Sequence, residues 1–214
     1  MTTAFPAPLR VLGLTGGIAS GKSAVGDIIA RRYPVLDADH VAREVVRPGT
    51  EGLARIVEAF GPEVLCGDGT LDRRGLRQII AHDEAARLRL NHILHPLIRA
   101  EIERKLEALA AHHDAAFVSA ALMLETGSYR RYDGVLLVTA PESVRLARLL
   151  ARDGMDEESA RGLMAKQWAD EKKRPFATVE VENAGDLADL ERHTWDALDR
   201  LGLAVDRVQR TSRG

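Results

Sequence analysis

The sequence predicts an α/β fold in which helices flank a parallel sheet, and three observations support this prediction. Short apolar runs typical of strands alternate along the chain with stretches that have the period of helices. A glycine-rich loop follows the first apolar run and leads directly into a helical pattern. From about residue 47 to about residue 113 the strand pattern disappears, which indicates a helical subdomain inserted into the sheet domain.

The bulk composition narrows the possible partners. A chain of 214 residues, 45% of them hydrophobic, is long enough for one domain over residues 1–214 with such an insertion. The formal net charge of −2 provides no overall attraction to nucleic acid or to an anionic membrane. We therefore expect a small-molecule substrate and no nucleic-acid or membrane partner.

Cysteine content and hydropathy suggest a compartment. The single cysteine, Cys66, excludes an internal disulfide and any multi-cysteine metal site, which fits a reducing environment. Neither a signal peptide near Met1 to Leu9 nor an apolar run of about 18 residues is readable. We expect a cytoplasmic protein whose polar last residues, Arg207 to Gly214, are frayed.

The elements follow one another in a regular order. Leu9 to Thr15 is expected to be a strand, and Val25, Ile28 and Ile29 then place apolar groups on one face of a helix. Val35-Leu36 is a second short strand. Four helices are expected to follow it: Thr50 to Phe60, Arg73 to Ala81, Glu84 to Ile93, and Pro96 to Ala111.

Strands return in the second half of the chain. The expected strands are Ala115 to Ala121, Gly134 to Val138 and Val179 to Val181; a helix from Pro141 to Arg152 follows the second of them. In a final helix, Leu187, Leu190, Leu198 and Leu201 are expected to face inward.

The glycine-rich loop has the spacing of a phosphate-binding loop. Gly16, four further residues and Gly21-Lys22-Ser23 match G-x-x-x-x-G-K-[ST] between a strand and a helix that is expected to begin near Ser20. Main-chain N–H groups and the positive helix end hold phosphates, Lys22 reaches the β and γ phosphates, and Ser23 ligates Mg²⁺. The predicted nucleotide-binding residues of this loop are Gly16, Gly17, Ile18, Ala19, Ser20, Gly21, Lys22, Ser23 and Ala24.

The rest of the sequence narrows the class of nucleotide-binding protein to which the chain can belong. The motif N-K-x-D that reads guanine is absent, and the D-x-x-G at Asp72 opens a helix, so a GTPase is disfavoured. The strand that ends Val138-Thr139 lacks the acidic pair of a mechanical ATPase. These exclusions leave a kinase that acts on a small molecule.

A kinase of this type needs a carboxylate near the acceptor hydroxyl. Asp37 and Asp39 follow the second strand and lie beside the loop if that strand neighbours the first. In this interpretation Asp39 orients the hydroxyl and accepts its proton, and Asp37 helps to hold Mg²⁺. The equally weighted alternative is that the pair caps a helix over Ala38 to Val46.

A basic helix face suggests a lid. Arg145, Arg148 and Arg152 share one face of the helix after Pro141, as a cationic stripe free of the core. Gly154 breaks that helix before another one begins, so we expect a lid over about residues 145–177 that closes on a triphosphate. For each single arginine, a solvated helix face is the alternative.

Taken together, these residues resemble the dephospho-CoA kinase family from about Val11 to Leu201. The resemblance is carried by the phosphate loop, Asp37-Ala38-Asp39 with Arg43-Glu44-Val45-Val46, Pro48-Gly49, Phe60-Gly61, Gly69-x-Leu71-x-Arg73, His95-Pro96-Leu97-Ile98 and Glu182-Asn183-Ala184-Gly185. It implies a P-loop kinase core with an inserted helical substrate domain and a lid. The implied reaction transfers the γ-phosphoryl group of ATP to the 3′-hydroxyl of dephospho-CoA with Mg²⁺.

The resemblance also implies roles for single residues. Lys22 and Asp39 become catalytic, and Asp37, Asp39 and His95 contact the acceptor substrate. Arg148 and Arg152 become nucleotide contacts. For His95 a buried structural role is favoured over a chemical one, and Asn183 either lies near the adenine or caps the last helix.

Three positions depart from the family pattern, and two other functions remain as alternatives. Ala121 replaces a proline, Ala177-Thr178 replaces Ala-Asp, and Leu163 replaces an arginine four residues before Gln167. A shikimate-type kinase shares the loop and the D-x-D but lacks so large a helical insertion. A nucleotide-binding module without catalysis needs no acceptor carboxylate.

Overall fold

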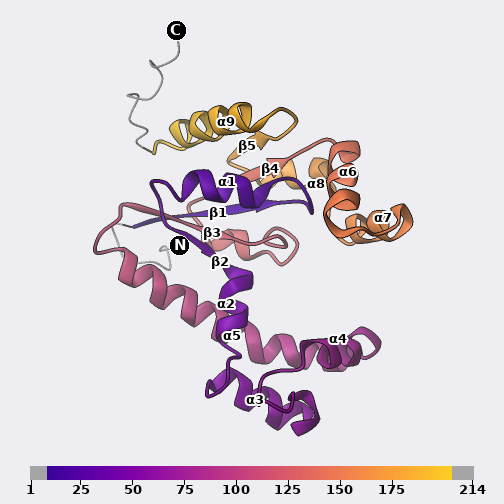
Figure 1. Ribbon diagram of the computed structural model, residues 1–214. Helices are drawn as coiled ribbons and strands as arrows, with labels where there is room; N and C mark the ends of the chain where they lie inside the picture. The colour runs from indigo at the N-terminus through magenta and orange to yellow at the C-terminus, as the bar shows by residue number, and fades with distance from the viewer. Residues whose placement is uncertain (1–8, 204–214) are drawn as a thin grey trace. The chain divides into compact units, whose positions relative to one another are not determined.

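The computed structural model describes residues 9–203, and the expected alternation of strands and helices is present in this range (Figure 1). The expected frayed end, Arg207 to Gly214, and the segment before Leu9 lie outside the described residues. The strands are β1 (Arg10–Gly16), β2 (Val35–Asp37), β3 (Ala115–Ser119), β4 (Gly134–Thr139) and β5 (Val179–Glu182). The helices are α1 (Lys22–Ile29), α2 (Ala38–Glu44), α3 (Glu51–Phe60), α4 (Arg73–His82), α5 (Glu84–Leu109), α6 (Glu142–Asp153), α7 (Glu157–Ala165), α8 (Asp170–Lys173) and α9 (Leu187–Arg200).

The strands form one sheet in the order β2-β3-β1-β4-β5. The pairings of β1 with β3, β1 with β4, and β4 with β5 are parallel, which confirms the parallel sheet. The sequence left open whether the second strand lies beside the first, and it does not. Instead β3 separates β2 from β1, so the nearest strand end on that side of the phosphate loop is Ser119.

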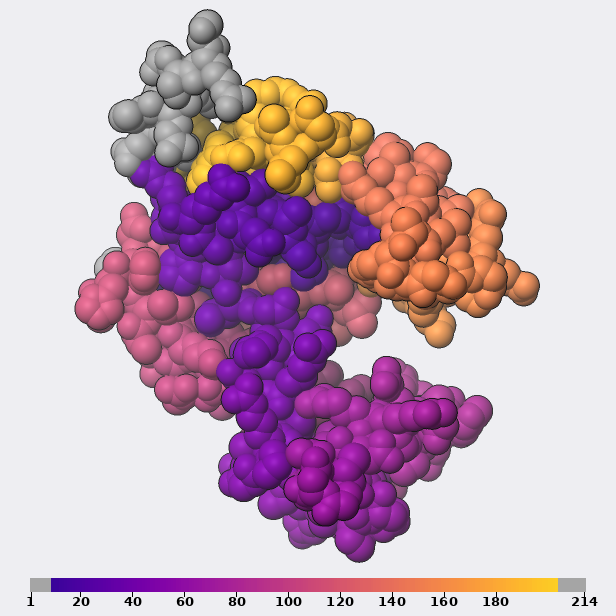
Figure 2. Space-filling view, viewed as in Figure 1, coloured from indigo at the N-terminus to yellow at the C-terminus, as the bar shows by residue number. Residues whose placement is uncertain are grey.

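Both faces of the central strands are buried, as their unbroken apolar sequences require. On one face, side chains such as Leu12 and Phe117 pack with Ile28 of α1 and Leu198 of α9. In Figure 2 the yellow surface of α9 lies against the indigo surface of α1. On the other face Met123 packs so close to Gly13 that a Cβ there would lie 2.5 Å from its sulfur.

The last helix differs from expectation at one position. Leu190, Leu198 and Leu201 are buried as predicted, but Leu187 is 64% exposed. Leu187 is the first residue of α9 and directly follows the N-cap Asp186. Leu187 therefore lies at the very end of the helix, and the buried leucines come from the turns that follow.

The chain divides into two compact units. One contains the described residues up to Val35 and from Leu109 onward, and the other spans Leu36–Ala108. The second unit overlaps the helical insertion that we expect at about residues 47–113, although it starts earlier and also contains α2. It has its own core, made by Val46, Ile56, Val64, Leu76 and Leu90.

Capping residues set the starts of the helices in the second unit. The Thr50 hydroxyl accepts a hydrogen bond from Leu53 N–H at the start of α3, and the Asp72 carboxylate accepts from Arg74 and Gly75 at the start of α4. This confirms that the D-x-x-G at Asp72 opens a helix.

Helix α5 runs through a proline, although the sequence predicted two separate helices. Pro96 lies inside the 26-residue helix Glu84–Leu109. Proline removes one main-chain hydrogen bond, yet the helix continues past it, with buried side chains on both sides, Leu90 before it and Ile102 after it. Within residues 9–203, no helix has the length and apolar character that a membrane span requires.

Candidate active site

The phosphate loop joins the end of β1 to the start of α1. The helix begins at Lys22, slightly later than the sequence predicted, with Gly21 as its N-cap. Gly21 has φ 94° and Ala19 has φ 60°, so the loop turns through two left-handed residues before the helix starts. Gly21 offers no side-chain cap to the first turn, and the N–H groups there are therefore left to bind an anion.

Side chains from distant elements crowd the glycines of the loop. A Cβ on Gly16 would lie 2.6 Å from the Val138 carbonyl oxygen, and one on Gly17 would lie 2.7 Å from Cζ of Arg145. A Cβ on Gly21 would overlap the Asn183 side chain. These positions accept only glycine, and the residues present fit a polyphosphate cradle made of main chain.

The ammonium group of Lys22 is held at the carboxyl end of β3. Its Nζ donates to Ser119 Oγ at 2.6 Å, and Ser119 is buried. Sequence analysis missed Ser119, although its place near the end of the strand predicted over Ala115 to Ala121 was a usable signal. The serine holds the lysine ammonium group at the loop.

Asn183 connects α6 to the loop. Its Nδ2 donates to the Ser20 carbonyl oxygen at 2.9 Å, and its Oδ1 accepts from Arg148 Nη2 at 3.2 Å. The helix-capping alternative for Asn183 is wrong, because Asp186 caps α9. Arg148 Nη1 is buried and has no hydrogen-bond partner, which leaves one strong donor beside the loop.

The predicted arginine stripe is wrong at Arg145. This side chain is only 6% exposed, and its Nη1 lies 3.2 Å from the buried Asp170 carboxylate. Arg152 is exposed and forms a two-bond pair with Asp153. That pair lowers the pKa of the Asp153 carboxyl through the hydrogen bond from Arg152. The three arginines share a helix face, but the chain after α7 folds over the first of them.

The second unit contains the acidic pair. Asp37 caps α2, since its Oδ1 accepts from His40 N–H at 2.9 Å, so the capping alternative holds for this residue. Asp39, in the first turn of α2, is exposed. Capping uses one oxygen of Asp37 and leaves the other oxygen and the Asp39 carboxylate available.

His95 is not the buried residue that we expected. It lies in the middle of α5 and is exposed, as is Pro96. The buried positions of α5 are Ala86, Leu90, Ile102 and Leu106, and His95 is not among them. A structural role inside a core is therefore excluded for His95.

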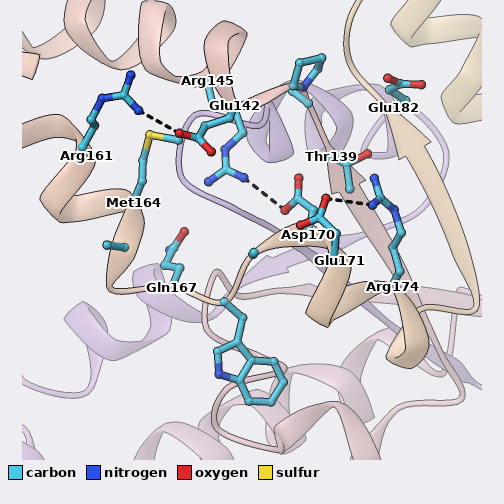
Figure 3. Close-up of a pocket in the computed structure, with 15 residues that line it drawn as sticks. Thr139, Glu142, Arg145, Arg161, Met164, Gln167, Asp170, Glu171, Arg174 and Glu182 are labelled. Atoms are coloured by element: carbon cyan, nitrogen blue, oxygen red, sulfur yellow. Dashed lines mark hydrogen bonds and ion pairs between the residues drawn. The ribbon is translucent and has the colours of Figure 1, made fainter.

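A cavity of about 590 Å³ lies in the first unit between β4, α6 and the segment after α7 (Figure 3). Arg145 points into it toward Asp170, and Arg161 and Arg174 lie on opposite sides of it. Each of these guanidinium groups is paired with a carboxylate. The cavity is thus bordered by neutralised charges rather than by a free cationic surface.

The sequence model of one family, dephospho-CoA kinase, matches residues 10–189. The chain belongs to the dephospho-CoA kinase family. This confirms the resemblance that its motifs indicated, and with it the P-loop kinase fold class.

Relatives named dephospho-CoA kinase match most of the chain. The one from Frankia casuarinae is 45% identical over 185 residues, 84% of this chain and 78% of the relative. The one from Methylococcus capsulatus is 40% identical and covers 90% of this chain and 96% of the relative.

Solved structures agree with this assignment. A Thermus thermophilus protein of known crystal structure superposes with a TM-score of 0.78 at 34% identity, over 90% of this chain and 97% of that one. Dephospho-CoA kinase from Campylobacter jejuni gives a TM-score of 0.69 at 25% identity over the same shares.

The departures from the dephospho-CoA kinase pattern lie in the first unit, at half-buried or exposed positions. Ala121, in place of proline, still offers its carbonyl oxygen to the Thr15 hydroxyl at 3.4 Å. Thr178, in place of aspartate, accepts from Val135 N–H at 2.9 Å and so joins β4 to the start of β5. Both replacements preserve local structure.

Sequence analysis missed a buried group of polar residues in this member of the family. Lys173 is fully buried, and its Nζ lies 3.4 Å from Glu125 Oε1, which also accepts from Trp168 N–H at 3.0 Å. Gln167 Oε1 accepts from Ile18 N–H in the phosphate loop at 2.7 Å. Charged residues in a polar stretch gave no signal of burial, since only the long-range fold covers them.

Proposed function

We propose that this chain transfers the γ-phosphoryl group of ATP to the 3′-hydroxyl of dephospho-CoA, which gives CoA and ADP and completes CoA biosynthesis. The observation that carries the proposal is the family match over residues 10–189, which includes an intact phosphate loop. Phosphoryl transfer depends mainly on positioning and on charge neutralisation, which this loop supplies.

In this proposal the loop from Gly16 to Ala24 holds the phosphates through its main chain and the start of α1. Lys22 moves from Ser119 to the β and γ phosphates, where it neutralises the charge that develops during transfer. Arg148 donates through its free Nη1, and Arg152 and Asn183 complete the nucleotide contacts. Residues 145–177 act as the lid that excludes water.

Mg²⁺ is part of the proposal and would be held by Ser23 and Asp37. The Ser23 hydroxyl is exposed in the first turn of α1, and both groups offer the oxygen ligands that Mg²⁺ prefers. When bound there, the ion would supply positive charge that offsets the charge of the phosphates. Since Mg²⁺ takes most ligands from phosphates and water, two protein oxygens suffice.

The acceptor side of the reaction is assigned to the second unit. Asp39 orients the 3′-hydroxyl and accepts its proton as the bond to phosphorus forms, and its exposure leaves it accessible to a substrate. His95, exposed on α5, is proposed to contact dephospho-CoA. The other helices of the second unit would bind the rest of that molecule. We continue to predict that the reaction takes place in the cytoplasm.

One experiment separates this function from its rivals. ATP consumption is measured with dephospho-CoA, adenosine and shikimate offered side by side, and Lys22→Ala is the negative control. We expect turnover with dephospho-CoA alone and no transfer by Lys22→Ala, whose thermal melt stays that of a folded protein. Turnover only with shikimate or adenosine indicates another kinase, and binding of ATP without any turnover indicates a binding module.

A further inference from the structure

Both main-chain groups of Ile18, in the middle of the phosphate loop, are held by side chains from the far end of the chain. The N–H donates to Gln167 Oε1 at 2.7 Å, and the carbonyl oxygen accepts from Arg145 Nε at 3.1 Å. Neither bond belongs to the strand or to the helix that flank the loop. The loop conformation is therefore fixed from outside.

A buried acid keeps Arg145 in place. The carboxylate of Asp170 lies 3.2 Å from Arg145 Nη1, and both side chains are more than 90% buried. The guanidinium also covers Gly17, where an added Cβ would collide with it. Because a buried charge is tolerated only when paired, loss of Asp170 leaves the guanidinium uncompensated beside the loop.

The residue that follows Ile18 explains why such support is needed. Ala19 has φ 60°, and among residues 9–203 it is the one residue other than glycine with a positive φ. The left-handed conformation is unfavourable for alanine and persists only where surrounding contacts enforce it. The two bonds to Ile18 act immediately next to this strained residue.

The segment that carries Gln167 and Asp170 is itself anchored by hydrogen bonds and an ion pair. Between Gln167 and Asp170, the N–H of Trp168 donates to Glu125 Oε1. Three residues after Asp170, the fully buried Lys173 pairs with the same carboxylate. Gln167 and Asp170 thus extend toward the loop from an anchored piece of chain.

We propose that Arg145, Gln167 and Asp170 are positioning residues that hold Ala19 in its strained conformation and so keep the phosphate loop ready for ATP. This inference rests on the proposed ATP site but concerns binding of the nucleotide, not the identity of the acceptor. The three residues act through the main chain of Ile18 rather than by touching the substrate.

The first test removes the side-chain oxygen of Gln167 that accepts the hydrogen bond from Ile18 N–H. In the full-length protein, Gln167→Leu raises the Kd for ATP, measured by calorimetry, about tenfold, the loss expected for one hydrogen bond. The same substitution in an Ala19→Gly background raises the Kd much less, because glycine adopts the left-handed conformation without support. The matched reference for the second comparison is Ala19→Gly alone.

The second test removes the charge that pairs with Arg145. Asp170→Asn keeps the shape of the side chain, and we expect it to raise the Kd for ATP about tenfold or more while kcat at saturating ATP changes less than threefold, the pattern of lost binding. Glu171→Gln is the control, because Glu171 is exposed and pairs with Arg174 instead. The control should keep the wild-type Kd.

Two results overturn the inference. One is a wild-type Kd for ATP in Gln167→Leu or in Asp170→Asn. The other is an equal loss of affinity in the alanine and glycine backgrounds, which indicates that Gln167 does not act on the strain at Ala19. Both of these results are Kd values for ATP, measured without dephospho-CoA, so a failure of the proposed function is seen separately, as ATP binding without CoA formation.

Discussion

Lys22 shows how a motif and its setting combine at the scale of one residue. The motif predicts that this lysine reaches phosphates, and the structure adds that its ammonium is held by Ser119. A hydroxyl partner is neutral, so it orients the amine without competing strongly for it as a carboxylate would. The lysine can therefore change partner when a polyanion binds.

Asp39 is the residue on which the proposed chemistry depends most. We expect Asp39→Asn to reduce the rate of transfer by about 10² to 10⁴, the range for a positioned proton-transfer group, while ATP binding is retained. Steady-state assays beside ATP calorimetry provide the measurement. Undiminished turnover removes Asp39 from the mechanism.

At the scale of the element, α2 combines a structural and a functional carboxylate. Asp37 caps the helix, and Asp39 follows in the first turn. Replacement of Asp37 by alanine should destabilise the protein by about 1 kcal/mol, the usual value of an N-cap. Serine also caps helices well, so a serine at position 37 tests the proposed Mg²⁺ ligand separately from the helix cap.

We predict that Asp37→Ser keeps most of the stability but needs several-fold more Mg²⁺ for half-maximal activity, because a hydroxyl is a weaker ligand for Mg²⁺ than a carboxylate. Urea unfolding and a Mg²⁺ titration of the rate are the two measurements. An unchanged Mg²⁺ requirement would leave Asp37 with capping alone.

An ion pair between two helices makes the stability of the second unit depend on pH. Lys105 of α5 lies 2.8 Å from Glu44 of α2, and the hydrogen bond from Lys105 lowers the pKa of the Glu44 carboxyl. A carboxyl group whose pKa is lowered in the folded state stabilises the protein at pH values above the ordinary pKa of 4.5. This stabilisation is lost as the pH falls through the folded-state pKa.

Glu44→Gln should therefore destabilise the protein at about pH 7, and the difference from the wild type should be smaller at about pH 3. Urea unfolding at both pH values measures it. Glu107→Gln, at an exposed position of α5, the helix that carries Lys105, is the control and should be neutral at both pH values. A Glu44 deficit that persists unchanged at the acidic pH contradicts the assignment to ionisation.

At the scale of the whole molecule, the division of the chain into two units separates the proposed donor and acceptor sites. The phosphate loop belongs to the unit with the sheet, and Leu36–Ala108 carries Asp39 and His95. Hydrogen exchange should therefore respond differently to the two substrates, since bound ligand protects the segments that it contacts.

We expect ATP to protect amides around Gly16 to Ala24 and dephospho-CoA to protect amides within Leu36–Ala108. Exchange followed by mass spectrometry on the intact protein gives the measurement, and the Lys22→Ala variant controls for specific ATP binding. Protection by dephospho-CoA confined to residues 109–203 would contradict the assignment of a substrate-binding subdomain.

The sequence by itself determined the phosphate loop, the strands around it, most helix starts and the family. These features depend on residues close together in the chain: glycines and a lysine at fixed spacing, caps followed by apolar periodicity, and β-rich runs. The same local reasoning ended one helix at Ile93 and began another at Pro96, because it saw the missing hydrogen bond and not the buried side chains on both sides of the proline.

The tertiary structure alone decided which distant side chains complete the site. Strand β3 enters between β1 and β2, and this brings Ser119 rather than an aspartate to Lys22. Asn183 bonds to Ser20 across 163 positions, and Arg145 is buried because Asp170 folds over it. Pairings at such separations follow from packing the whole chain, and no short stretch of sequence contains the information that selects them.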